Sequence, residues 1–242
     1  MTNKKIILII FFVLLIIIII LGAVFVLDND VKKEILNEED ALRENNSQII
    51  NEISEGEIVE VSDIDNNDHY IGKLNSPVEF IVYCDFTDIF CGDLNSSIKE
   101  MKEKFTDDIV VAYRHFLVGD NNMSVVSVIA SECACEQDKF WEMHQALYAL
   151  NQSNELTKEN IQESANEISL DIDQFNNCLN SERYIDKINT QKEEAKNYGV
   201  IGAPTIFVNK EILPGAYPSE DFVDSTGRER QGLKSVIEKY LY

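Results

Sequence analysis

The chain is poor in basic residues, which narrows the partners it can have. It holds 43 aspartates and glutamates against 21 lysines and arginines, a formal net charge of −22 at pH 7. A surface with this balance repels the phosphates of nucleic acids and the head groups of anionic lipids. The composition therefore argues against a nucleic-acid-binding protein and is compatible with basic or unfolded polypeptides as partners.

Histidine is scarce as well, with three residues in the chain. Cysteines and aspartates gather in residues 84–91, and thiolates and carboxylates are common metal ligands. No histidine is placed to complete a site with them. We therefore expect no metal and no cofactor, and we expect His115 and His144 to be packing or surface residues.

Residues 6–27 lack charge altogether and are dominated by Ile, Leu, Val and Phe. As a helix rising about 1.5 Å per residue, they would span about 33 Å, enough for a hydrocarbon core of about 30 Å. Two lysines precede the stretch and two aspartates follow it, which places residues 1–5 in the cytoplasm. We predict one transmembrane anchor in the lipid bilayer of the cell membrane, with the main domain extracytoplasmic. A cleaved signal peptide is the alternative, but a small-x-small cleavage site is lacking.

Residues 28–57 are acidic and contain no proline. Their apolar residues fall at spacings of four and seven, a weak heptad trace. We predict an acidic tether that holds the following domain, 58–242, away from the membrane. A stalk helix that pairs with another copy is the alternative.

The five cysteines include no Cys-x-x-Cys, the pair that exchanges disulfides at a helix N-terminus. Residues 78–84 are largely β-branched and aromatic, as in a buried strand, and helix-capping aspartates follow. A helix is predicted from Ile89, and the free N–H groups of its first turn would stabilise a thiolate. Asp88 stands where the first sulfur of such a pair would be, and only the second, Cys91, is present.

The remaining pattern predicts an α/β fold. Strands are expected at 58–61, 78–84 and 109–113, and a final helix at 233–241. The order strand, helix, strand builds a right-handed parallel unit. Helices are expected at 124–136, 140–150, 158–168 and 181–198, with a short piece at 171–179, and a closing hairpin at 205–208 and 212–213.

Three segments carry a resemblance to a known family: residues 113–116 (Tyr-Arg-His-Phe), 132–144 (beginning Glu-Cys-Ala-Cys) and 199–209 (containing Gly-Ala-Pro-Thr). In this order they resemble the DsbA-like branch of the thioredoxin superfamily, the thiol-disulfide oxidoreductases of exported proteins. The resemblance covers residues 58–242. It implies a thioredoxin-like fold, a central mixed sheet flanked by helices, with an inserted helical subdomain at about 122–198.

The resemblance also implies roles for single residues. Asp88 replaces the nucleophilic cysteine, and the buried carboxylate that helps proton transfer falls on Val82. Pro204 would be the cis-proline that faces the active-site helix, although an ordinary turn proline is the alternative. Ala203 and Phe90 would then contact an extended client, which can add to the exposed backbone as a strand.

The cysteines leave several pairings open. Cys133 and Cys135 lie two apart on a predicted helix and cannot bond to each other. The resemblance favours a disulfide between Cys133 and Cys178, with buried free thiols as the alternative. A bond between Cys84 and Cys91 is disfavoured, because a strand end and a helix's first turn usually lie more than about 7 Å apart. Cys84 is therefore expected to be a plain core cysteine.

Two functions are consistent with these residues. Asp88 is expected to cap the helix, with a role as acid, base or ligand as the alternative. Cys91, by resemblance the resolving cysteine, is expected to be a quiet, partly buried thiol, with a monothiol that forms mixed disulfides with clients as the alternative. The first function is a DsbA-like oxidoreductase whose dithiol exchange is lost or weakened, acting with a membrane redox partner. The second is a non-enzymatic, chaperone-like module that binds unfolded or extended exported proteins beside Pro204.

Overall fold

The computed structural model describes residues 56–119, 121–181 and 183–242. The predicted tail at 1–5, the anchor at 6–27 and nearly all of the tether at 28–57 lie outside these residues. Within them, no helix is both long enough and apolar enough to cross a membrane. The described part is thus essentially the domain predicted at 58–242.

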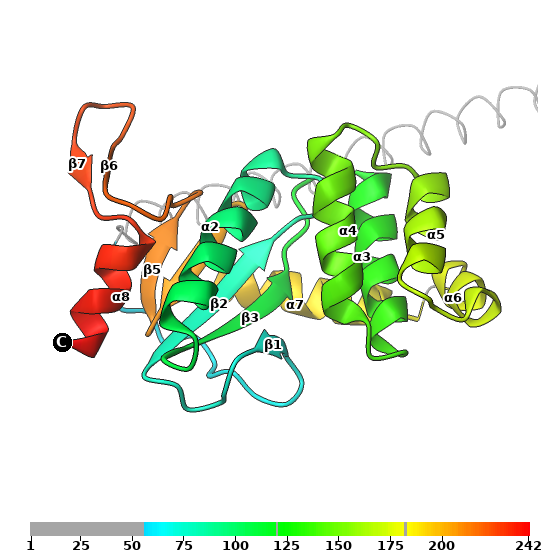
Figure 1. The fold of residues 1–242 in the computed structure, drawn as a ribbon, viewed down its shortest axis with the longest axis horizontal. Coiled ribbons are helices and arrows are strands. Elements are labelled where there is room, and N and C mark those ends of the chain that lie inside the picture. The colour runs from blue at the N-terminus through cyan, green and yellow to red at the C-terminus, as the bar shows by residue number, and fades with distance from the viewer. Residues whose placement is uncertain (1–55, 120, 182) are drawn as a thin grey trace, which may run out of the picture. The chain divides into compact units, whose positions relative to one another are not determined.

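A five-stranded mixed sheet forms the centre of this domain, in the order β1-β3-β2-β4-β5 (Figure 1). β2 and β3 are parallel and are joined by helix α2, whereas the other neighbours are antiparallel. The predicted thioredoxin-like sheet is therefore confirmed. The elements are β1 (His69–Ile71), β2 (Val78–Cys84), α2 (Ile89–Phe105), β3 (Ile109–His115), β4 (Thr205–Val208) and β5 (Glu211–Pro214).

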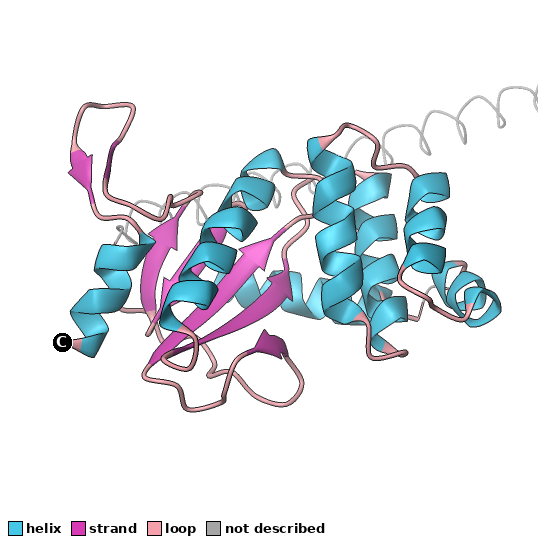
Figure 2. Ribbon diagram, in the orientation of Figure 1, coloured by secondary structure: helices cyan, strands magenta, loops and turns pink. Residues whose placement is uncertain are grey.

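The central strands are buried on both faces, which explains their nearly continuous apolar sequence. Phe80 and Val82 of β2 belong to the core shared with α2 and with α8 (Leu233–Leu241). Ile81 and Tyr83 point the other way, because successive strand residues alternate, and they pack with α7 (Ile185–Asn197). Figure 2 shows α2 in front of the sheet and α7 behind it.

Four further helices are inserted between β3 and α7 and pack together beside the sheet (Figure 1). The inserted helical subdomain is therefore confirmed. The boundaries of the first three lie within two residues of the prediction, because their apolar spacing is regular. These helices are α3 (Asn122–Cys135), α4 (Phe140–Gln152), α5 (Lys158–Glu167) and α6 (Ile172–Leu179).

The sheet edges differ from the prediction. Residues 58–61 form no strand and contribute one bridge, from Ile58 to Glu211 at the outer side of β5. The edge strand on the other side is β1, in a segment where no strand was predicted. A small hairpin of β6 (Phe222–Val223) and β7 (Glu229–Arg230) was also not predicted. Whether a short edge strand forms depends on the neighbouring strand with which it pairs, and local sequence does not encode that neighbour.

Candidate functional site

The site begins where β2 ends and α2 starts. Asp88 is the N-cap of α2, and its Oδ1 accepts a hydrogen bond from the backbone N–H of Cys91 at 3.0 Å. This confirms the predicted capping role. Burial raises the pKa of the half-buried Asp88 carboxyl; the N–H groups of Cys91 and Phe90 oppose this, and the charges of two nearby aspartates add to it. The positive end of the helix therefore already holds a carboxyl group.

A second aspartate, Asp85, fixes the turn from inside. It is fully buried, and its Oδ1 accepts hydrogen bonds from the backbone N–H and the hydroxyl of Thr87, each at 2.9 Å. Its Oδ2 accepts from the N–H of Val118 at 3.0 Å. Since Val118 follows β3, Asp85 ties the loop after β3 to the start of α2. Its partners lie in the turn and in that loop, and sequence pattern alone did not indicate this role.

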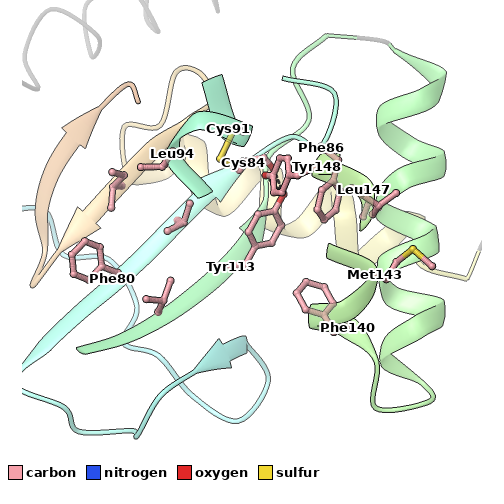
Figure 3. Packing of buried hydrophobic residues seen from close by; sticks show 14 of the residues in the cluster. Phe80, Cys84, Phe86, Cys91, Leu94, Tyr113, Phe140, Met143, Leu147 and Tyr148 are labelled. Carbon is pink, nitrogen blue, oxygen red and sulfur yellow. Dashed lines mark hydrogen bonds between the residues drawn. A yellow bond between two sulfur atoms is a disulfide. The ribbon is translucent and has the colours of Figure 1, made fainter. Parts of the chain in front are cut away.

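Cys84 and Cys91 are joined by a disulfide, which corrects the expectation that both are free thiols. Their Cα atoms are 5.8 Å apart, because the turn folds the chain back through the hydrogen bond from Asp88 N–H to Asp85 carbonyl oxygen. This separation lies within the usual disulfide range. Each cysteine is only 1% exposed, so the bonded sulfurs lie behind the helix tip (Figure 3).

Apolar side chains gather at the same edge of the sheet. Ile89 and Phe90, at the tip of α2, are 58% and 55% exposed, and Val118 and Ile201 are 47% and 59% exposed. The carboxyl ends of β2 and β3 lie at this edge with the start of β4, since Cys84 pairs with His115 and Tyr83 with Thr205. We call these four residues the client face.

The peptide bond between Ala203 and Pro204 is cis, as the resemblance implied. It directly precedes β4 and therefore lies at the same edge as the client face. Pro204 is buried, whereas Ala203 is partly exposed and lies outside the ladder between β2 and β4. The predicted residues Asp88, Phe90 and Ala203 thus share one edge of the sheet.

Behind the tip lies a cavity of about 270 Å³ between α2, α4 and the sheet. The Cys84–Cys91 disulfide forms part of its wall, together with Val82 at the position implied for a buried carboxylate. Figure 3 shows the sulfurs near Tyr113 and Tyr148. The residues that line it are Ile71, Val82, Cys84, Cys91, Asn95, Ile98, Lys99, Lys102, Glu103, Val111, Tyr113, Trp141, His144, Gln145 and Tyr148.

His144, one of these lining residues, is buried in an aromatic cluster and its Nδ1 has no hydrogen-bond partner among the described residues. Burial lowers the pKa of His144 to about 3, and electrostatic interaction with the other two histidines acts in the same direction. The imidazole is therefore neutral at physiological pH. Its ring neighbours are Phe86, Tyr113, Phe140, Trp141 and Tyr148.

A buried ion-pair network lies at the end of β3. Glu132 Oε1 lies 2.8 Å from His69 Nε2 and 2.9 Å from His115 Nε2, and Lys187 Nζ donates to Oε2 at 2.8 Å. Burial raises the pKa of Glu132, but the hydrogen bonds to the imidazoles outweigh it and hold this pKa well below its ordinary value. Burial lowers the pKa of His115. Sequence reasoning missed this network.

The two histidines and Glu132 offer three ligand atoms within 4.8 Å of one another, a set that could hold a divalent metal. The ammonium of Lys187 lies 2.8 Å from Glu132 Oε2 and 3.3 Å from His69 Nε2, where it competes with such an ion. Because Lys187 already neutralises the carboxylate of Glu132, the charge of this carboxylate is balanced within the network by an ion pair.

The helical insertion contains the second disulfide, between Cys133 on α3 and Cys178 on α6. Their Cα atoms are 5.7 Å apart, and this is the pairing that the resemblance implied. Both cysteines are fully buried. Cys135 keeps a free thiol, and its Sγ lies 3.7 Å from His69 Nδ1.

Comparison with known proteins assigns the chain to a family, since residues 65–225 match the family model described as Thioredoxin. The chain belongs to the thioredoxin family. This thioredoxin-family chain is 32% identical over 170 residues to the Na(+)/H(+) antiporter NhaA 1 of Salinispora arenicola. It is 31% identical over 156 residues to NhaA 3 of Salinispora tropica. The matches cover 69% and 64% of the chain but 26% and 24% of those proteins, so the chain spans about a quarter of their length.

Solved structures share the fold of this thioredoxin-family domain. Oxidised BdbD of Bacillus subtilis superposes with a TM-score of 0.62 at 20% identity, over 76% of this chain and 98% of that one. α-DsbA1 of Wolbachia pipientis gives 0.57 at 22% identity, over 74% and 92%. The catalytic domain of Proteus mirabilis ScsC gives 0.57 at 18% identity, over 73% and 90%. The DsbA-like fold predicted from the sequence is thus confirmed.

Proposed function

We propose that this thioredoxin-family protein has lost dithiol exchange with protein clients at the tip of α2. The proposal rests on one observation, which is where the sulfur atoms lie relative to the tip of α2. Asp88 caps the helix where the exchanging sulfur is expected, and the Cys91 sulfur is buried and bonded to Cys84. Exchange requires a thiolate that reaches the client disulfide, and a carboxylate cannot form a disulfide. The bond to Cys84 also removes the basis for mixed disulfides through a free Cys91 thiol.

The protein's place in the cell is part of the same proposal. Residues 6–27 support a transmembrane anchor, and the lysines before them support an extracytoplasmic position for the domain. Disulfides persist in such oxidising surroundings, and the domain contains two of them. Clients would then be exported proteins.

Reduction of insulin by dithiothreitol, with the protein as catalyst, tests the loss of exchange. We expect no catalysis by the wild type. The double variant Asp88→Cys/Cys84→Ser places a sulfur at the tip and frees Cys91 to pair with it, so it should catalyse the reaction. Asp88→Ser/Cys84→Ser is the matched control and should be inert. Catalysis by the wild type that Cys91→Ser abolishes would refute the proposal.

A second function, binding of extended polypeptides without chemistry, is favoured by the client face. Four exposed apolar side chains at one edge of a sheet form the kind of surface that marks an interaction site. Ala203 lies next to β4 and outside its ladder, where an extended segment could add as a strand. The acidic surface would favour basic or unfolded clients.

Binding of a fluorescent, reduced and alkylated polypeptide, followed by anisotropy, tests this second function. Phe90→Ser/Ile201→Ser should weaken binding by about tenfold or more, the loss of about 1.4 kcal/mol. Val223→Ser is the matched control, because Val223 is 64% exposed but belongs to the β6–β7 hairpin. Equal affinities for all three proteins would rule out the client face as the binding surface.

A further inference from the structure

The two disulfides of the domain are both buried, but they differ in what surrounds them. Cys84 and Cys91 line the cavity between α2 and α4, whereas Cys133 and Cys178 do not line it and are packed between α3 and α6. A buried disulfide in a closed core reacts only when the protein opens, because exchange requires access to a sulfur. A disulfide in a cavity wall can react in the folded protein.

The cavity opens to the surface between α2 and α4. Its lining includes the exposed side chains of Lys99 and Glu103 on α2, Gln145 on α4 and Ile71 on β1, whereas the disulfide and Val82 in the same lining are buried. One hydrogen bond crosses the mouth, from Asn95 Nδ2 to Gln145 Oε1 at 3.4 Å. A bond of this length between partly exposed groups is weak, so the mouth can admit a solute.

The size and walls of the cavity select the class of solute. Its volume of about 270 Å³ lies near the lower end of the range of small-molecule sites, so the cavity suits a small molecule. Trp141, Tyr113 and Tyr148 make the walls suited to an apolar or aromatic body. The charged lining residues are Lys99, Lys102 and Glu103, so two ammonium groups face one carboxylate and the net positive charge suits a carboxylate on the solute. Lys99 has no hydrogen-bond or ion-pair partner among the described residues and is therefore the cation available to bind it.

We propose that the Cys84–Cys91 disulfide is a redox site for small thiols that enter this cavity, in particular thiols with an apolar body and a carboxylate. The thiolate attacks Cys84 Sγ, the bond between the protein sulfurs breaks, and Cys91 leaves as a thiolate that takes up a proton. The Cys91 thiolate is short-lived and is protonated as it leaves, because the carboxylate of Asp88, which caps the first turn of α2, opposes its negative charge.

A second small thiol completes the reaction. Its thiolate attacks the small molecule's sulfur in the mixed disulfide, which forms a small-molecule disulfide and releases the Cys84 thiolate to take up a proton. Two small thiols thus lose two electrons and two protons, and the protein disulfide gains them. The site is separate from the client face, so the proposal does not depend on client binding or on exchange at the helix tip.

The test follows both disulfides in one folded protein. The protein is treated with 4-(mercaptomethyl)benzoic acid, quenched and alkylated, and the cysteine peptides are measured by mass spectrometry over time. We expect Cys84 and Cys91 to be reduced at least about tenfold faster than Cys133 and Cys178, a difference of about 1.4 kcal/mol in barrier. Equal rates for the two disulfides, or free Cys84 and Cys91 in the untreated protein, would overturn the proposal.

Variants of the cavity separate entry from local unfolding. Ile98→Trp fills the cavity and should slow reduction of Cys84–Cys91 by about tenfold, while Ile98→Val, the matched control, should not. Gln145→Ala removes the bond across the mouth and should speed reduction, which keeps the test decisive should Ile98→Trp not fold. Lys99→Gln should slow the carboxylate thiol but not its neutral amide analogue. Rates unchanged in Gln145→Ala and in a folded Ile98→Trp would show that the sulfurs are reached by unfolding.

Discussion

Replacement of His144 by phenylalanine should make the domain less sensitive to mild acid. The imidazole is buried among aromatic rings, with its Nδ1 unpartnered among the described residues, and its pKa is lowered to about 3. Unfolding exposes the ring, and its pKa returns to the ordinary value of about 6.5. Between these two values the unfolded chain binds a proton that the folded domain does not bind. The free energy of unfolding therefore falls as the pH falls from about 6.5 toward 3.

The size of the effect follows from the two pKa values. Each pH unit well inside that window costs about 1.4 kcal/mol, and the first part of the fall below pH 6.5 costs less, so lowering the pH from 6.5 to 4.5 should cost the wild type about 2 kcal/mol through His144 alone. In His144→Phe this contribution disappears. Phenylalanine is larger than histidine, but the adjoining cavity provides room for it. We therefore expect His144→Phe to fold, with similar stability at pH 7.

Urea denaturation at pH 7, 6, 5 and 4.5 measures this difference. Other titrating groups, such as Glu132 and His115, also change the stability, but they contribute to both proteins and cancel in the comparison. The curves of unfolding free energy against pH should diverge below pH 6.5, with the variant losing less. Parallel curves down to pH 4.5 would refute the argument, because they would mean that His144 takes up its proton equally well in the folded domain.

Three further changes should alter stability, measured by urea denaturation. Arg114→Met removes the guanidinium that lies 2.7 Å from the carboxylate of Asp68, whose side chain is 7% exposed. Because this leaves a buried charge unpaired, the free energy of unfolding should fall by about 3–5 kcal/mol. A fall of less than about 1 kcal/mol would mean that the pair is effectively solvated. Cys178→Ser opens the disulfide to Cys133, which closes a separation of 45 residues, and should cost about 4 kcal/mol in the chain-entropy estimate; no change would show that the bond is absent in solution. Asp88→Ala removes the N-cap and should cost about 1 kcal/mol, whereas Asp88→Asn keeps the acceptor and should cost little; equal losses would disprove the capping role.

Local sequence pattern predicted the elements whose side chains alternate or recur regularly. β2 and α8 have the bounds expected from their apolar residues, and α3, α4 and α5 differ by two residues or fewer. The strand expected at 58–61 is absent, since these residues pair with β5 at one bridge only. Formation of an edge strand depends on its pairing partner, which the local pattern does not specify. The cis peptide bond before Pro204 and the Cys133–Cys178 disulfide came from family resemblance and not from local pattern.

The parts of the site that sequence missed are those made by contacts between distant residues. Glu132 meets His69 across 63 positions and Lys187 across 55, and no spacing within one element indicates such a meeting. The cavity lies where helices from two parts of the chain leave space over the sheet. The Cys84–Cys91 bond was missed for a different reason. The two cysteines lie seven positions apart, and whether they meet depends on how tightly the intervening turn folds back.

The substitutions at the helix tip are physically consistent with one another. The N-terminus of a helix favours one negative charge, and Asp88 takes the position where a DsbA-like thiolate would otherwise be stabilised. A thiolate at Cys91 would then be opposed by that carboxylate, but a sulfur in a disulfide carries no charge. Val82 lines the same cavity at the position where the resemblance implied a carboxylate that helps proton transfer. Such a carboxylate is not needed when no thiol at the helix tip exchanges disulfides. Restoring a sulfur at position 88 while Cys84 stays bonded to Cys91 should therefore leave the tip inert, and only its combination with Cys84→Ser should restore exchange.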